Sequence, residues 1–183
     1  MAETNIPTGK ETQATQADGA APAGENRSAQ AVPRQGEETH TYEVGLTWSG
    51  DETGCGEVRV AGGAFGVPIG GAKELGGCGK GANPEELLLA AVGACFINTW
   101  AIFLRKLQVA YSDPAVRVGG TLGRDPAGGY KMTGATIRAL VPASLLEGER
   151  EKVEKTLSLA EKYCIISKVA KAAMPVTVIL EEV

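Results

Sequence analysis

The chain has 183 residues, four cysteines and a formal net charge of −4, and 43% of its residues are hydrophobic. This length is enough for one domain with an appendage and a sizeable core. The negative charge argues against nucleic acid as a partner, because nucleic-acid sites select basic patches. It suits a soluble cytoplasmic protein. The cysteines form no Cys-x-x-Cys pair, which excludes a zinc ribbon and a thioredoxin-type motif, and a chain this long needs no disulfide scaffold of the secreted kind.

Residues 1–40 differ in composition from the rest of the chain. Their only large aliphatic side chains are Met1, Ile6 and Val32. Such a segment cannot bury enough apolar surface to offset its ordering entropy. We therefore predict a disordered N-terminal tail over 1–40 and a folded domain over 41–183. The tail has no apolar core of a secretory signal, and its acidity argues against a mitochondrial presequence; a partner-binding tail stays open beside an extension with no specific role.

Three strands are predicted after the tail. Apolar and polar side chains alternate from Tyr42 to Trp48, as in a half-buried strand. A turn over 49–54 precedes a second strand that begins near Val58. A third strand is predicted over 64–69.

A glycine-rich loop then leads into a long apolar helix. The loop covers 70–81 and contains Cys78; it is not a phosphate-binding P-loop, because its Gly-Lys is followed by glycine. Asn83 is a good N-cap and Pro84 fits the first helical position. The next residue, Glu85, suits the positive end of the helix dipole. The helix is predicted to continue to about Leu104.

The apolar character of this helix predicts a dimer. Residues 87–104 carry no charge over 18 positions, which meets the lower length limit for a membrane span. We reject a membrane span, because Asn98 and Thr99 lie inside the apolar run and the flanking segments are typical of soluble β-structure. A helix that is apolar all round can instead be the central helix of a core. In a domain this small, burial on every side requires a second subunit.

The remaining elements complete an α+β pattern. Strands are predicted over 115–122 and 130–141, a helix from Ser144 or Glu147 to Tyr163 with one or two further turns over 165–172, and a last strand over 176–180. One stripe of the second helix is apolar, and it consists of Leu146, Val153, Leu157, Ala160 and Cys164. The order β-β-β-α-β-β-α-β predicts an α+β fold.

Two cysteines are candidates for chemistry. Most buried cysteines are inert fillers, and both Cys95 and Cys164 lie on predicted core elements. Against that interpretation, Asn98 and Thr99 place polar groups one turn beyond Cys95. Lysines at 162 and 168 flank Cys164 and are expected to favour its thiolate.

Two motifs resemble those of the OsmC/Ohr family of thiol-dependent peroxidases. One is the helix start Asn83-Pro84-Glu85-Glu86-Leu87, whose helix reaches Ala94-Cys95-Phe96, and the other is Cys164-x-x-Ser167. The resemblance spans Trp48 to the C-terminus. It implies an intertwined homodimer with two long central helices wrapped by sheets, and a cytoplasmic enzyme of oxidative-stress defence.

The resemblance also implies a mechanism. Cys95 attacks an organic hydroperoxide and becomes a sulfenic acid, and Cys164 condenses with it to a disulfide that a dithiol or lipoyl-type reductant reduces. Glu85 is the family's acidic partner of the reactive thiol. No metal, flavin or other cofactor is implied. Since Glu85 lies ten residues before Cys95, about 15 Å along a straight helix, direct contact needs a break in the helix, for which Gly93 is the obvious place.

The sequence departs from the family in two places. The family's catalytic arginine lies in the first hairpin turn, but this chain has none there and carries Cys55 instead; Arg59 on the next strand is expected to face solvent. Ile165 follows Cys164 where the family usually has proline. The sole histidine is His40, so a Cys-His relay is improbable. A divergent member is indicated, and the alternative function is a non-enzymatic module that binds a hydrophobic ligand or partner at the dimer groove.

Overall fold

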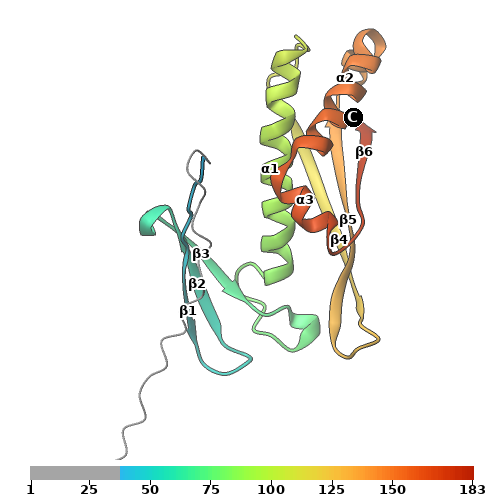
Figure 1. Cartoon of the computed structure of the whole chain (residues 1–183). Helices are drawn as coiled ribbons and strands as arrows, with labels where there is room; N and C mark the ends of the chain where they lie inside the picture. Colours follow the sequence, from blue (N-terminus) through green and yellow to red (C-terminus); the bar gives the residue numbers. More distant parts are fainter. Residues whose placement is uncertain (1–37) are drawn as a thin grey trace, which may run out of the picture. The chain divides into compact units, whose positions relative to one another are not determined.

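The predicted order of strands and helices is confirmed by the computed structural model, which describes residues 38–183 (Figure 1). The elements are β1 (Gly45–Ser49), β2 (Cys55–Val60), β3 (Phe65–Gly70), α1 (Pro84–Lys106), β4 (Ala115–Arg124), β5 (Tyr130–Val141), α2 (Ala143–Tyr163), α3 (Ile165–Lys171) and β6 (Val176–Glu182). The short helix α3 supplies the extra turns expected after α2. The predicted disordered tail, apart from residues 38–40, lies outside the described residues.

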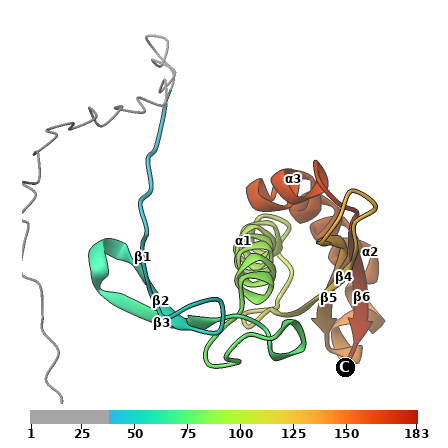
Figure 2. The same cartoon turned by 90° about the horizontal axis from the view of Figure 1, so that it is seen from below.

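Two three-stranded sheets carry the fold. The first has the order β1-β2-β3 with antiparallel neighbours. In the second, of order β4-β5-β6, β4 and β5 are antiparallel whereas β5 and β6 are parallel. A parallel pair needs a long crossover, which α2 and α3 provide (Figure 2). The α+β class is therefore confirmed.

The hydrophobic core lies between the second sheet and the helices. Alternate residues of β5 point into it, as a period of two requires, and they are Ala135, Ile137, Ala139 and Val141. Helix α1 contributes a stripe at every fourth residue, made of Val92, Phe96, Trp100 and Leu104. All five predicted stripe positions of α2 and its end are buried as well. The indole N–H of Trp100 donates to the Thr156 hydroxyl at 2.9 Å and joins α1 to α2.

Gly93 brings α1 close to β4. The break at this residue that direct contact between Glu85 and Cys95 would need does not occur, because α1 runs unbroken from Pro84 to Lys106. Gly93 is buried, and a Cβ atom there would lie 2.9 Å from Cγ2 of Val118 on β4. The glycine thus permits close packing of helix on sheet.

Outside its buried stripe, α1 exposes further apolar side chains. Leu88 and Ile102 are 38% and 39% exposed, and several alanines lie between them along the helix. By length and composition α1 could cross a membrane, although its buried stripe belongs to the core. The first sheet also exposes large apolar side chains, among them Leu46 and Phe65. Apolar surface of this extent is typical of an interface with another protein chain.

A disulfide ties the glycine-rich loop to the first sheet. It joins Cys55, the first residue of β2, to Cys78, with their Cα atoms 6.5 Å apart. Gly70 pairs with Cys55 across the sheet, and a Cβ there would overlap the Cys78 sulfur. The loop ends at Ala82, whose N–H and C=O bond to Pro68 and Gly70. Both ends of the segment before α1 are thereby fixed.

Removing this disulfide should destabilise the domain. We expect the Cys55→Ala/Cys78→Ala double variant to lose about 3 kcal/mol of unfolding free energy, because a closed loop of this size restricts the unfolded chain. Urea denaturation without reductant measures the loss. Under strong reductant the wild type should lose most of the same difference, and equal midpoints for the two proteins without reductant would contradict the expectation.

Candidate active site at Cys95 and Cys164

Cys95 lies half-buried in the middle of α1, at the contact with α3. Its sulfur accepts a hydrogen bond from the backbone N–H of Ile166 at 3.4 Å, although the two residues are far apart in the sequence. The Thr99 hydroxyl donates to the Cys95 carbonyl at 2.8 Å, one turn further along α1. The thiol is thus held by the first turn of α3, while the Thr99 hydroxyl bonds to the backbone of Cys95.

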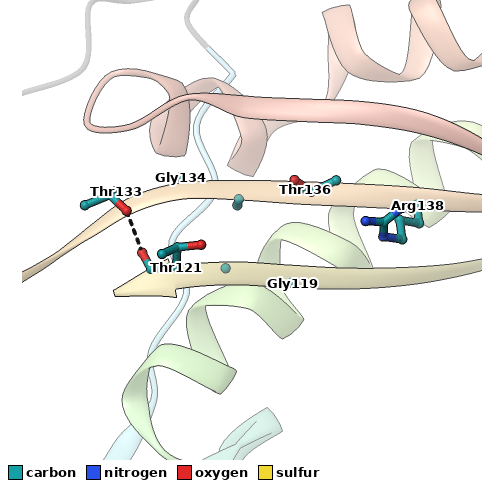
Figure 3. Close-up of a pocket in the computed structure, with 8 residues that line it drawn as sticks. Gly119, Thr121, Thr133, Gly134, Thr136 and Arg138 are labelled. Carbon is teal, nitrogen blue, oxygen red and sulfur yellow. Dashed lines mark hydrogen bonds between the residues drawn. The ribbon is translucent and has the colours of Figure 1, made fainter. Parts of the chain in front are cut away.

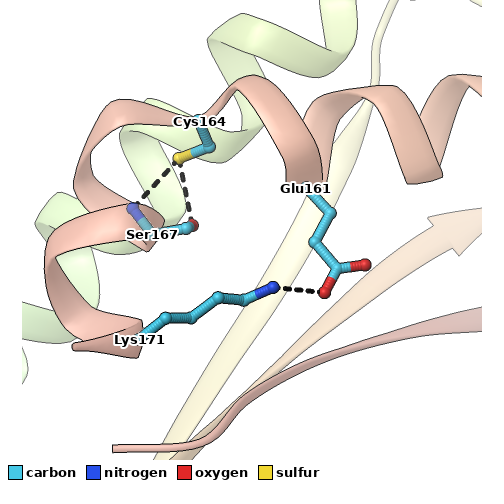
Figure 4. Close-up of polar contacts among 4 residues, drawn as sticks. All are labelled: Glu161, Cys164, Ser167 and Lys171. Carbon is cyan, nitrogen blue, oxygen red and sulfur yellow. Dashed lines mark hydrogen bonds and ion pairs between the residues drawn. The ribbon is translucent and has the colours of Figure 1, made fainter. Parts of the chain in front are cut away.

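Cys164 is fully buried at the junction of α2 and α3. It is the C-cap of one helix and the N-cap of the next, with extended backbone angles that turn the chain. Its sulfur accepts from the backbone N–H and the hydroxyl of Ser167, at 3.4 and 3.0 Å (Figure 4). Beside it, Lys171 of α3 and Glu161 of α2 form an ion pair of 2.5 Å across the same turn.

Consecutive N–H groups therefore serve the two sulfurs. Ile166 donates to Cys95 and Ser167 donates to Cys164, both from the first turn of α3. Both thiols are free in this structure. The predicted site residues Cys95 and Cys164 are brought together by this shared turn.

The surroundings shift the two thiol pKa values in opposite directions. Burial raises the pKa of Cys95, but hydrogen bonds from the Ile166 N–H, the Cys164 thiol, the Ile165 N–H and the Thr99 hydroxyl outweigh it, so the pKa lies below its ordinary value. Burial dominates at Cys164 and, with the neighbouring Cys95, raises the pKa of that thiol in spite of the hydrogen bonds from Ser167. Cys95 is therefore the better nucleophile.

The expected lysine effect at Cys164 is wrong. The ammonium groups of Lys162 and Lys168 lie 5.5 and 5.9 Å from the centroid of the Tyr163 ring. They stabilise the exposed ring as cation–π partners. Although Lys162 and Lys168 are close to Cys164 in the sequence, they do not lie beside its sulfur, because Cys164 points into the core.

Glu85 does not meet Cys95 within one helix. It occupies the first turn of α1, where Asn83 and Glu86 form a capping box with hydrogen bonds of 2.7 and 2.9 Å. Because α1 is unbroken, Glu85 remains about 15 Å from Cys95 along the helix axis. Within a single chain the carboxylate serves the helix dipole.

The first hairpin turn is built by an aspartate. Asp51 accepts from the N–H and the hydroxyl of Thr53, and these hydrogen bonds lower its pKa. Arg59 pairs with Glu57 at 2.8 Å and its side chain is 56% exposed, as expected for a solvent-facing arginine. Cys55 next to this turn is held in the disulfide. The pairing of Cys55 with Cys78 could not be found from sequence, because spacing alone gives no disulfide connectivity.

Two hollows of similar size lie on the surface. One, of about 400 Å³, is an apolar groove beside the N-terminal half of α1, lined by Glu86, Leu89, Ala90, Gly93, Ala94, Ile97, Val116 and Val118. The other, of about 390 Å³, lies on β4 and β5 among glycines, threonines and Arg138 (Figure 3). Arg138 pairs with Glu181 at 3.6 Å. The first hollow adjoins the cysteine-bearing helix, and a third hollow of about 510 Å³ lies at the C-terminal end of the same helix, lined in part by Ala101, Leu104 and Arg105. Within residues 38–183, no three His, Cys, Asp or Glu side chains gather as a metal site requires.

Comparison with known proteins agrees with this geometry. The family model "OsmC-like protein" matches residues 77–179. A relative from Staphylococcus saprophyticus, "Organic hydroperoxide resistance protein-like 1", is 30% identical over 97 residues, which is 53% of this chain and 67% of the relative. A relative of the same name from Staphylococcus epidermidis is 30% identical over 57% of this chain and 73% of its own length.

Solved structures show the same fold. An organic hydroperoxide resistance protein OsmC from Legionella pneumophila superposes with a TM-score of 0.63 at 22% identity, covering 78% of this chain and 99% of the other. An OsmC-like protein from Mycoplasma pneumoniae reaches a TM-score of 0.66 at 13% identity over 80% of this chain and 99% of the other. The matched motifs, the order of the elements and the family model together make this chain a member of the OsmC-like family.

Proposed function

We propose that the protein is a thiol-dependent peroxidase that reduces organic hydroperoxides through Cys95 and Cys164. The observation that carries the proposal is the pair of free thiols held by consecutive N–H groups of α3, with the pKa of Cys95 lowered and that of Cys164 raised. Relatives named for organic hydroperoxide resistance support the substrate class. The apolar residues that flank Cys95 on α1, Ala94 and Phe96, favour organic peroxides over hydrogen peroxide.

The chemistry follows from the two environments. The Cys95 thiolate attacks one oxygen of the O–O bond, so the alkoxide leaves, takes up a proton and departs as an alcohol, and Cys95 becomes a sulfenic acid. The Cys164 sulfur then attacks the Cys95 sulfur, which releases water and forms a disulfide. A dithiol, for example of lipoyl type, restores both thiols and is itself oxidised to a disulfide. We place this reaction in the cytoplasm and assign it to the domain 41–183.

A second copy of the chain is needed if Glu85 acts on Cys95. The unbroken helix separates the two residues, while the exposed apolar faces of α1 and of the first sheet call for a partner. In a two-fold dimer, antiparallel central helices could bring the carboxylate at the start of one α1 toward the thiol in the middle of the other. We therefore propose a homodimer in which each site combines Cys95 and Cys164 with the partner's Glu85.

A non-catalytic role is the second candidate. The first hairpin turn lacks the arginine expected from the family, and the groove beside α1 is apolar. A protein that only binds a hydrophobic ligand or partner there would have no use for a thiol with a lowered pKa. The cysteine variants below separate the two functions.

Substitutions of the two cysteines should block the reaction at different steps. Cys95→Ser should abolish consumption of cumene hydroperoxide, because it removes the attacking thiolate. Cys164→Ser should react once and then proceed to sulfinic acid, visible by mass spectrometry as two added oxygens on Cys95. Wild type given one equivalent of peroxide should yield a linked Cys95–Cys164 peptide. Undiminished turnover in Cys95→Ser would refute the mechanism, and hydrogen peroxide serves as the less reactive comparison substrate.

Oxidation of Cys95 should depend on pH as its lowered pKa requires. Only the thiolate attacks, so the rate should rise about tenfold per pH unit and level off below the pH at which an ordinary thiol titrates. Cys164→Ala removes the thiol that donates to the Cys95 sulfur and should move the midpoint to higher pH. Stopped-flow sulfenic-acid trapping measures the rate, with Thr133→Val on β5 as a control whose midpoint should not move.

Mixing two inactive variants tests the shared site. Glu85→Gln should lower activity about a hundredfold by removing a charged group from the reaction. Mixed with Cys95→Ser after reversible unfolding, it should regain about a quarter of wild-type activity, because half of the dimers then hold one complete site. If Glu85 acts within its own chain, the mixture stays inactive. Light scattering on the same samples reports the mass of the dimer.

A further inference from the structure

We propose that Ser167 is a positioning residue for the resolving step: it holds the Cys164 sulfur and favours its thiolate, so that Cys164 closes on an oxidised Cys95. The role of Ser167 in forming the disulfide depends on the proposed function, whereas its hydrogen bonds to Cys164 are observed in the structure. Separate experiments therefore test the role and the contact.

Ser167 gives the Cys164 sulfur two hydrogen bonds. Its hydroxyl lies 3.0 Å from the sulfur and its N–H lies 3.4 Å away (Figure 4). Both residues are buried, with exposures of 1% for Ser167 and 0% for Cys164. Since the site excludes bulk water, these donors take the place of the solvent that stabilises a thiolate at the surface.

The arrangement is unusual for a helix start. N-cap positions prefer oxygen side chains, because oxygen accepts well from the N–H of the third residue; sulfur accepts weakly unless it is charged. In a capping box the third residue reaches back to the N-cap N–H. Here the Cys164 N–H is already bonded to the Ala160 carbonyl at 2.9 Å, so the Ser167 hydroxyl serves the sulfur instead.

No strong charge competes with this contact. Lys162 and Lys168 lie over the Tyr163 ring, and Glu161 and Lys171 neutralise each other across the turn. The titratable group that faces Cys164 from α1 is Cys95. Ser167 is therefore the main polar control of the Cys164 thiol.

Ser167 acts when Cys164 attacks the oxidised Cys95 and again when the disulfide is reduced. The Cys164 thiolate attacks the sulfur of Cys95–SOH, the new S–S bond forms, and the leaving hydroxide takes up the proton that Cys164 has lost. When the reductant's thiolate later attacks Cys95, the electron pair returns to the Cys164 sulfur, where the same two donors receive it. Cys95 itself keeps its bond from Ile166, so its first attack on peroxide does not depend on the Ser167 hydroxyl.

A titration tests the contact without any peroxide. In a Cys95→Ser background with the Cys55–Cys78 disulfide intact, Cys164 is the only free thiol, so the difference in 240 nm absorbance from a Cys95→Ser/Cys164→Ser protein, which cancels the tyrosines, reports on its thiolate alone. Adding Ser167→Ala should move the titration midpoint to higher pH. Adding Ser167→Thr, which keeps a hydroxyl, should leave it near the starting value. An unchanged midpoint in Ser167→Ala overturns the inference.

Single-turnover kinetics test the role in the reaction. Ser167→Ala in otherwise native protein should form the Cys95 sulfenic acid at the wild-type rate but resolve it about fivefold more slowly, the effect of losing one hydrogen bond. Sulfinic acid should accumulate in proportion. Thr156→Val is the matched control, because it removes a buried hydroxyl that bonds Trp100 and no sulfur.

The outcomes are distinguishable. Slower resolution in Ser167→Ala, rescued by Ser167→Thr and absent in Thr156→Val, supports the inference. Equal slowing in Thr156→Val means that general packing is responsible and overturns it. Wild-type Cys95 that never reacts with peroxide sinks the proposed function, while the titration still decides whether Ser167 controls Cys164.

Discussion

The packing of α1 against α2 and α3 determines where the Cys95 and Cys164 sulfurs lie relative to each other. Cys95 is one residue before Phe96 in the buried stripe of α1, and Cys164 ends the buried stripe of α2. The buried layer that the two helices share, made of Phe96 and Trp100 from α1 and Val153, Leu157 and Ala160 from α2, fixes the height of one helix on the other. Any sliding between these helices would separate Cys95 from the Ile166 N–H, so the chemistry at the thiols depends on ordinary core packing.

Local patterns predicted most of the architecture. The alternation in the strands, the Asn83-Pro84 helix start and the stripe of α2 each follow from a period or a cap that a few neighbouring residues define. The two thiols were identified because they lie in motifs shared with the OsmC-like family. Their contact could be expected from that resemblance, since the residues alone only put each cysteine on a core element.

What escaped prediction depends on contacts between distant segments. Gly93 was the obvious place for the break that contact between Glu85 and Cys95 would need, but its actual role is to let Val118 approach an unbroken α1. Lysines beside Cys164 in sequence turned to a tyrosine ring once the thiol was buried. Ile165, where the family usually has proline, supplies a backbone N–H toward Cys95 that proline lacks. These contacts depend on which side of each turn or helix faces the core, and the spacing of residues in the sequence does not determine that side.

The proposed reaction would need two free thiols in a chain that also holds a disulfide, and this requirement restricts the choice of reductant. A single dithiol pool would have to keep Cys95 and Cys164 reduced while it leaves Cys55 bonded to Cys78. For a two-electron couple, each tenfold change in the reduced-to-oxidised ratio corresponds to about 30 mV. Keeping about 99% of one pair reduced and about 99% of the other oxidised therefore requires reduction potentials about 120 mV apart, with the loop disulfide the more negative. The glycine-rich loop thus sets a lower limit on the potential of the pool in which the protein can stay intact and active.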